Sequence, residues 1–228
     1  MMPKTGPIEK DIIKTSGGDL KITFIGHASL MFDYGSKIIH VDPVTAEADY
    51  KTLPKADLIV ITHDHYDHLD AAAIEALKKP GMEVVAGAPC AGKVAGAVIL
   101  KNGQSRKTTG IAIEAVPAYN IVHMRAPGHP FHPRGEGNGY VLTFGDMKIY
   151  VAGDTENIPE MAKLKDIDVA FLPMNLPYTM TPEMAADAAL KFRPKVLYPY
   201  HYGDTDVARL GALLKDEKGI EVRIRKMK

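Results

Sequence analysis

The chain of 228 residues has no tryptophan, only one cysteine and no net charge. Because Cys90 is alone, the sequence excludes an internal disulfide bond and any zinc site built from several cysteines. The 28 basic and 28 acidic residues balance, so no overall field attracts nucleic acid or an anionic membrane. No segment approaches the roughly 20 apolar residues of a membrane span. Any bound metal is therefore expected to be held by imidazole and carboxylate groups.

The composition is that of an ordinary globular protein, with 46% hydrophobic and 25% charged residues. No linker divides the chain, and its length suits one domain, which we expect to cover residues 1–228. The first residues contain no apolar stretch long enough for a signal peptide, which favours a cytoplasmic location. The expected partner is a small-molecule substrate, without nucleic acid or membrane.

Short aliphatic runs bounded by turn residues predict many β-strands. Strands are expected at residues 20–26, 29–35, 37–43, 57–62, 83–87, 104–110, 111–117, 139–145, 147–155, 168–173, 195–203 and 221–227. Helices are expected at residues 71–79, 159–164, 182–192 and 206–215, with a short helical piece from residue 89. Asp70 and Thr181 are the predicted N-caps of the first and third of these helices.

Residues 120–139 interrupt this pattern with three prolines, four glycines and three histidines. Proline lacks a backbone donor and glycine loosens the backbone, so the segment predicts neither a regular helix nor a central strand. A long loop in a compact domain is usually functional or disordered. We therefore expect an irregular loop here.

The segment VITHDHYDHLD places three histidines and three aspartates directly behind an aliphatic strand. Side chains two residues apart in an extended strand point to the same side, so His63 and His65 can reach one ion. Asp67 and His68 follow on the turn before a helix, and this spacing suits two adjacent ions. Without a metal such a cluster has few structural uses, because crowded imidazoles and carboxylates repel or desolvate one another.

Other aliphatic strands also end in residues of the metal-binding type. Asp42, Asp154 and His201 each follow such a run. Each alone has an ordinary explanation, as a turn residue, an N-cap or a core histidine. Their recurrence at strand ends indicates one shared site.

The motifs HDHYDH at 63–68, GDT at 153–155 and the late His201 resemble the motif series of the metallo-β-lactamase superfamily, over nearly the whole chain. GHAS at 26–29, PAYN at 117–120 and PYHYG around His201 resemble its small metal-dependent hydrolase branch, which includes the ascorbate-phosphate lactonase-like group. This resemblance implies an α+β fold, an αββα sandwich with a metal cleft at one edge of the two sheets.

By position, the resemblance implies two divalent metal ions, with zinc as the expected metal and manganese or iron as alternatives. The ligands it implies are His63 and His65 for one ion, Asp67, His68 and His201 for the other, and Asp154 as a bridge. The catalytic residues it implies are Asp67, Asp154 and His27.

Two further residues have expected roles outside the set of ligands. Asp42 is expected to accept a hydrogen bond from a ligand histidine and so to select its tautomer. His40, in the middle of an aliphatic run, is expected to be structural.

Relatives commonly carry a histidine at the position of Asn120, as the third imidazole of the first metal site. Asparagine is a poor zinc ligand, so this site is predicted to be weaker, to prefer a harder ion such as manganese, or to use another residue. The following loop offers His123, His129 and His132. Of these we favour His132, because it has an aromatic neighbour and a rigid proline after it.

Two ions held in this way activate water for hydrolysis. The expected function is therefore a metal-dependent hydrolase that uses a metal-bound hydroxide on a small ester, lactone or phosphoester. Arg125, Arg134 and Lys163 are candidate contacts for a phosphate, and Tyr178 is a candidate substrate contact. Two alternatives remain open, namely a di-iron redox protein and a noncatalytic metal-binding or ligand-binding member of the fold.

Overall fold

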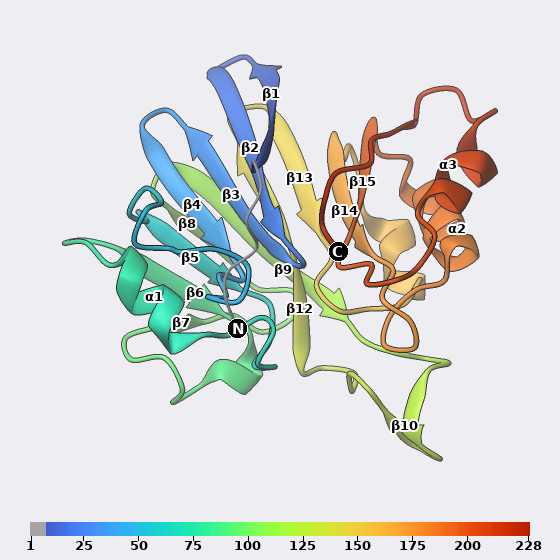
Figure 1. Cartoon of the computed structure of the whole chain (residues 1–228), viewed down its shortest axis with the longest axis horizontal. Coiled ribbons are helices and arrows are strands. Elements are labelled where there is room, and N and C mark those ends of the chain that lie inside the picture. The colour runs from blue at the N-terminus through green and yellow to red at the C-terminus, as the bar shows by residue number, and fades with distance from the viewer. Residues whose placement is uncertain (1–7) are drawn as a thin grey trace.

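Two seven-stranded β-sheets form the centre of the computed structural model, which describes residues 8–228 (Figure 1). The strands of the first sheet lie in chain order and are β1 (Glu9–Thr15), β2 (Gly18–Gly26), β3 (Ser29–Tyr34), β4 (Lys37–Val41), β5 (Leu58–Ile61), β6 (Glu83–Ala86) and β7 (Val98–Ile99). The strands of the second sheet, in spatial order, are β16 (Glu221–Val222), β15 (Val196–Tyr200), β14 (Val169–Pro173), β13 (Met147–Val151), β12 (Gly137–Phe144), β9 (Ile111–Ala118) and β8 (Ser105–Thr108).

In both sheets an antiparallel part continues into a parallel part. The strands from β4 to β7 run parallel, as do the strands from β13 to β16. Parallel strands end at the same edge of a sheet, and this edge is where ligands bind in open α/β sheets. The residues that follow β4, β5, β13 and β15 are thereby brought to one edge of the sandwich.

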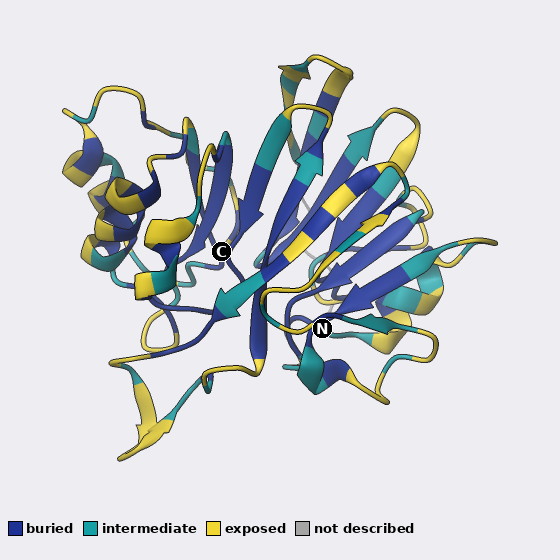
Figure 2. Ribbon diagram, turned by 180° about the vertical axis from the view of Figure 1, so that it is seen from behind, coloured by how far each residue is buried: buried dark blue, intermediate teal, exposed yellow. Residues whose placement is uncertain are grey.

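The main hydrophobic core lies between the two sheets. Phe24 of β2 packs against Phe171 and Tyr198 of the second sheet, with ring centroids 6.2 and 4.9 Å apart. Strands β5 and β14 are buried along their whole length, as expected for parallel strands covered on both faces. Figure 2 shows this burial along the inner strands and exposure on the outer loops and helices.

The helices lie on the outer faces of the two sheets. They are α1 (Ala71–Leu77), η1 (Ala88–Cys90), η2 (Pro159–Lys163), α2 (Pro182–Phe192) and α3 (Ala208–Leu214). Helix α1 packs on the first sheet through Ala73 and Leu77, and α2 and α3 pack on the second through Ala189 and Leu210. This helix, sheet, sheet, helix order confirms the α+β class and the αββα sandwich predicted from the sequence.

Both predicted helix caps are confirmed. Asp70 Oδ1 accepts a hydrogen bond from the backbone amide of Ala72 at 2.8 Å. Thr181 Oγ1 accepts one from the amide of Met184 at 3.1 Å, and Pro182 occupies the first turn. Each cap satisfies an amide that has no partner inside its helix.

Residues 120–139 are not wholly irregular, so the prediction of one long loop was wrong in part. β10 (Met124–Ala126) and β11 (His129–Pro130) form a short hairpin that projects from the body (Figure 1), and Gly137 begins the central strand β12. Glycine fits in β12 because the neighbouring backbone leaves no room there for a side chain. A Cβ atom on Gly139 would lie 2.7 Å from the carbonyl oxygen of Ala152.

The two ends of the described chain also differ from expectation. Strand β1 was not predicted, yet it pairs with β2 along seven residues. The last strand was expected over residues 221–227 but ends at Val222, and beyond it Arg225 forms an ion pair with Asp11 at 2.8 Å. Within the described part of the chain, every helix is too short or too polar to cross a lipid bilayer.

Candidate metal centre

Side chains from both sheets meet at the edge of the sandwich where the parallel strands end. Most of them come from the segments that follow β2, β5, β13 and β15, and the exception, His132, comes from the loop after β11. The converging side chains are His27, His63, His65, Asp67, His68, His132, Asp154 and His201.

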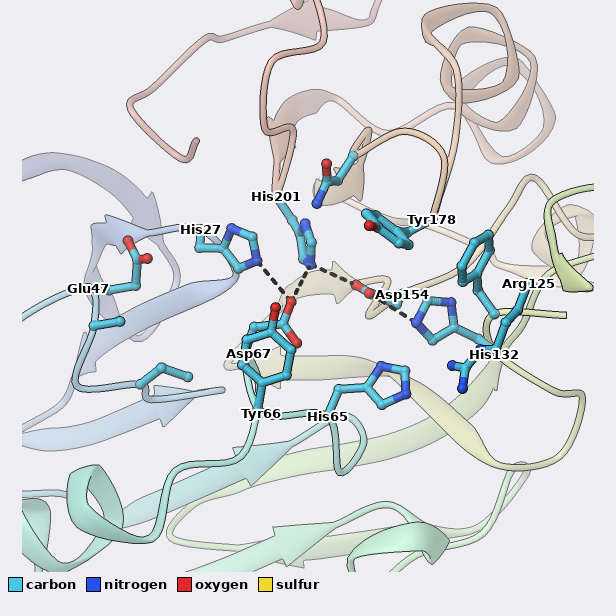
Figure 3. Close-up of a pocket in the computed structure, with 14 residues that line it drawn as sticks. His27, Glu47, His65, Tyr66, Asp67, Arg125, His132, Asp154, Tyr178 and His201 are labelled. Carbon is cyan, nitrogen blue, oxygen red and sulfur yellow. Dashed lines mark hydrogen bonds and ion pairs between the residues drawn. The ribbon is translucent and has the colours of Figure 1, made fainter. Parts of the chain in front are cut away.

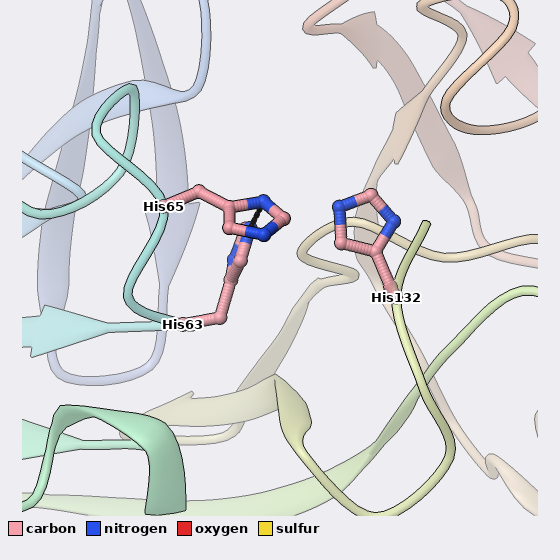
Figure 4. A group of neighbouring side chains, drawn as sticks. All are labelled: His63, His65 and His132. Atoms are coloured by element: carbon pink, nitrogen blue, oxygen red, sulfur yellow. Dashed lines mark hydrogen bonds between the residues drawn. The ribbon is translucent and has the colours of Figure 1, made fainter. Parts of the chain in front are cut away.

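Three histidines form the first cluster, which consists of His63, His65 and His132 (Figure 4). One ring nitrogen of each lies within 4.8 Å of the others. His63 Nε2 is 3.0 Å from His65 Nδ1, and the rings of His63 and His132 are perpendicular with centroids 5.2 Å apart. Three imidazoles that converge on one point form a ligand set typical of zinc sites.

The structure brings only His132 of the three loop histidines into this cluster. His123 Nδ1 instead lies 2.7 Å from a carboxylate oxygen of Glu156. His129 is exposed on β11. The replacement residue favoured from the sequence is thus the one that the fold places beside His63 and His65.

Asn120 lies behind His132 and is no part of the cluster. Its Oδ1 atom accepts hydrogen bonds from His132 Nδ1 at 2.7 Å and from the His132 amide at 2.9 Å. Because Nδ1 donates, the lone pair of this imidazole is on Nε2, which faces the cluster. The amide group of Asn120 therefore orients His132.

Glu156 is a buried residue of this region that the sequence did not single out. Burial favours a higher pKa, but the amides of Ile121, Val122 and His123 donate to the carboxylate and lower the pKa below its ordinary value. Asn120 Nδ2 also donates to it, at 3.1 Å. The only available signal was an acidic residue directly after the GDT motif, so its contact with a segment more than thirty positions away was not readable.

A second cluster surrounds Asp67. Its Oδ2 atom lies 3.2 Å from His27 Nε2, 3.6 Å from His201 Nε2 and 4.0 Å from His68 Nε2. His68 Nε2 and His201 Nε2 are 3.1 Å apart. Burial raises the pKa of Asp67, but His201 and His27 outweigh it and hold that pKa far below its usual range. The carboxylate is therefore ionised at neutral pH.

Asp154 lies between the two clusters (Figure 3). Its Oδ2 atom is 3.2 Å from His132 Nε2, whereas its Oδ1 atom is 3.3 Å from His68 Nε2 and 3.4 Å from His201 Nε2. Burial raises the pKa of this carboxyl group, but the surrounding imidazoles hold it well below its ordinary value. One carboxylate thus faces both groups of nitrogen atoms.

Asp42 makes the contact expected from the sequence. Its Oδ2 atom is 2.8 Å from His68 Nδ1, and Thr62 donates to the same carboxylate from its amide and its hydroxyl group. Burial lowers the pKa of His68, but Asp154 and Asp42 raise it well above its ordinary value. The Asp42 contact selects the tautomer of His68 and turns Nε2 toward Asp67.

These side chains fit metal ions. Among the described residues, His132 Nε2 and Asp154 Oδ1 are buried and form no hydrogen bond. Buried polar atoms without partners are costly and rare in native proteins. Cations placed between the clustered nitrogen and oxygen atoms would supply the missing partners.

The backbone at three of these positions is unusual. His27, Asp42 and His201 have φ angles of 51°, 43° and 44°, in the left-handed region that side chains other than glycine rarely adopt. Such strain typically costs about 1–3 kcal/mol per residue and concentrates at functional sites.

A cavity of about 670 Å³ opens over both clusters (Figure 3). Arg125 and Tyr178, two candidate substrate contacts from the sequence, line it. The other two candidates, Arg134 and Lys163, do not line it. Arg134 pairs with Glu160 at 2.7 Å, and Lys163 lies beside a separate cavity.

His40 lies apart from both clusters, as expected. It is fully buried, and its Nε2 atom donates to the carbonyl oxygen of Pro54 at 3.1 Å. Burial lowers the pKa of His40 to about 4. This histidine is therefore neutral and structural.

Known proteins resemble this chain in sequence and in structure. A family model described as beta-lactamase superfamily domain matches residues 21–201. A UPF0173 metal-dependent hydrolase of Pelotomaculum thermopropionicum is 31% identical, over 90% of this chain and 96% of its own length. A crystal structure from Parabacteroides distasonis has a TM-score of 0.93 and 52% identity, and the match covers 97% of this chain and 100% of the other. Igni18, a metallo hydrolase from Ignicoccus hospitalis, has a TM-score of 0.73 and 25% identity, with 91% and 95% covered.

Proposed function

The chain belongs to the metallo-β-lactamase superfamily, in its small metal-dependent hydrolase branch, and from this premise we propose that it hydrolyses a small ester, lactone or phosphoester at two divalent metal ions. The observation that carries the proposal is the pair of ligand clusters, joined by Asp154, on the wall of one cavity. A cavity of this size suits a small molecule.

We assign the ligands by cluster. His63, His65 and His132 hold the first ion, and Asp67, His68 and His201 hold the second, with Asp154 shared between them. Imidazole nitrogen outnumbers carboxylate oxygen in this set, which favours zinc over manganese or iron.

When bound, such ions lower the pKa of water toward neutrality and stabilise negative charge that develops on the substrate. The protein's own residues then place the reactants. Asp67, ionised and exposed to the cavity, accepts a hydrogen bond from the attacking water and orients it. His27 positions Asp67 through the contact at 3.2 Å, and its ring packs at a tilt against His201 with centroids 3.8 Å apart.

The proposal is tested by metal analysis and hydrolysis of a substrate panel, with His132→Ala compared with His129→Ala. The wild-type protein is expected to bind two zinc ions and to cleave at least one aryl ester, lactone or phosphoester. His132→Ala is expected to lose one ion and at least about 100-fold in kcat/KM, since it lacks a ligand. His129→Ala, altered at an exposed position of β11, is expected to match the wild type.

Two outcomes would contradict the proposal. Unchanged metal stoichiometry in His132→Ala would remove the ligand assignment. A protein loaded in turn with zinc, manganese and iron that cleaves nothing in the panel would remove the proposed substrate classes.

A further inference from the structure

Arg125 is set apart from the other arginines by its surroundings. Of the seven arginines, all of which lie in the described part of the chain, six form an ion pair with a carboxylate. Arg125 alone has no ion pair and no hydrogen bond to any described residue. A guanidinium group carries five donors in a planar fork, and those of the exposed Arg125 are open to solvent and to a ligand.

The position of this guanidinium group is that of a substrate contact. Arg125 belongs to β10, in the hairpin that projects beside the metal centre, and it lines the cavity over both clusters. Figure 3 shows its side chain extending toward the side of the cavity formed by His65 and His132. The carboxylate of Asp67, by contrast, is held among His27 and the second cluster.

Arg125 brings a positive charge to one side of the cavity, and Asp67 brings a negative charge to the other. We infer that Arg125 binds a negatively charged group of the substrate, and that the substrate is therefore an anionic ester, lactone or phosphoester. The inference rests on the proposed hydrolase function and narrows it. A carboxylate and a phosphate both match the planar fork of arginine, with two parallel hydrogen bonds. The anionic group lies on the His132 side of the cavity, away from Asp67.

The uncharged part of the substrate has an aromatic wall to lie against. The rings of Phe131 and Tyr178 meet edge to face, with centroids 4.9 Å apart, and both line the cavity. Such a wall suits an apolar or aromatic body. The inferred substrate therefore combines an apolar part with one terminal negative charge.

Two esters that differ by one terminal carboxylate group test the inference, namely mono(4-nitrophenyl) glutarate and neutral 4-nitrophenyl butyrate. Arg125→Met is expected to lower kcat/KM for the anionic ester about 10- to 100-fold, mainly through KM, since a hydrogen bond between charged groups is lost. The neutral ester is expected to change less than about 2-fold. Arg125→Lys is expected to be intermediate, because lysine keeps the charge and loses the fork.

Arg134→Met is the matched control, since Arg134 pairs with Glu160 outside the cavity, and it is expected to match the wild type on both esters. Calorimetry with glutaric acid monoanilide, butyranilide and phenylphosphonate supplies a readout without hydrolysis. Arg125→Met is expected to weaken binding of the two anions and to leave binding of butyranilide unchanged. The anion whose binding is weakened more shows whether Arg125 prefers a carboxylate or a phosphate-like group.

Equal kinetics and equal binding of anions in wild type and Arg125→Met would overturn the inference. If the wild type cleaves neither these esters nor any member of the substrate panel yet binds the anions in an Arg125-dependent way, the proposed hydrolase function fails and the anion site stands. Loss of activity on both esters alike in Arg125→Met would also overturn it, because the residue would then not distinguish charge.

Discussion

The histidines show at the residue scale that surroundings decide the role of a side chain. His40 is enclosed in the core and bonded to a carbonyl group, whereas His129 is exposed on a hairpin. The clustered histidines point ring nitrogens at one another, as His68 and His201 do at 3.1 Å. Ring nitrogens that lie this close together, with carboxylates beside them, form a ligand set that suits a cation.

Replacing Asn120 with alanine removes the oxygen that holds His132 Nδ1. We expect Asn120→Ala to lower the metal affinity of the first cluster about 10- to 100-fold, as is typical when a group that orients a ligand histidine is lost. Competition with a chromophoric zinc chelator measures this affinity. Asn157→Ala is the control, because Asn157 bonds Asp187 away from the cavity. Wild-type affinity in Asn120→Ala would show that the contact does not orient the ligand.

The sequence predicted the converging side chains better than it predicted what supports them. His63, His65 and Asp67 share one short motif behind a strand, so their proximity follows from local geometry. The roles of Asn120 and Glu156 depend on contacts between distant segments, which no local pattern encodes.

At the element scale, the positions of helix caps and central strands follow from local chemistry, whereas those of the edge strands of a sheet do not. The adjacent residues Thr181 and Pro182 specify the start of α2. Strand β1 alternates partly buried and exposed residues, with Ile12 exposed at 59%, so its apolar pattern is weak. Pairing with β2 decides its conformation, and tertiary context overrides propensity there.

Two glycine substitutions are expected to have opposite effects. Gly139→Ala forces a Cβ atom against the carbonyl oxygen of Ala152, so the free energy of unfolding is expected to fall by about 1–3 kcal/mol. Gly211→Ala, in α3 with open space around it, is expected to raise it by about 0.5–1 kcal/mol. Urea denaturation measures both. An unchanged midpoint in Gly139→Ala would mean that β12 accommodates the methyl group.

The whole molecule places its site where two sheets from the two halves of the chain meet. The parallel strands of both sheets end at this edge, and the sandwich core holds the sheets in place. The strand-end pattern in the sequence predicted that one shared site forms where strands end, whereas the layered fold was predicted from the resemblance to the superfamily. The opening of the cavity was not predictable from the sequence, because it depends on how the β10–β11 hairpin folds beside the clusters.

His40 is expected to make the stability of the whole molecule depend on pH. Its pKa is near 6.5 when unfolded and about 4 when folded, because burial disfavours the charged ring. Between these values the unfolded chain binds more protons, so stability present above pH 6.5 is lost as the pH falls toward 4. The full contribution is about 3 kcal/mol.

The measurement compares urea unfolding of wild type and His40→Gln at pH 7 and pH 4.5. Other titrating groups are common to both proteins, so the difference between them isolates His40. The wild type is expected to lose about 2–3 kcal/mol more than the variant over this range. Parallel losses in the two proteins would show that His40 does not titrate on unfolding.

The first cluster takes His63 and His65 from the half of the chain that builds the first sheet, and His132 from the other half. A cation bound there is a cross-link between the halves, comparable in topology to a disulfide bond that closes a long loop. With a single cysteine, the chain has no internal covalent link of that kind. Two separately produced halves would each carry an incomplete ligand set, so metal uptake by their mixture would report their assembly.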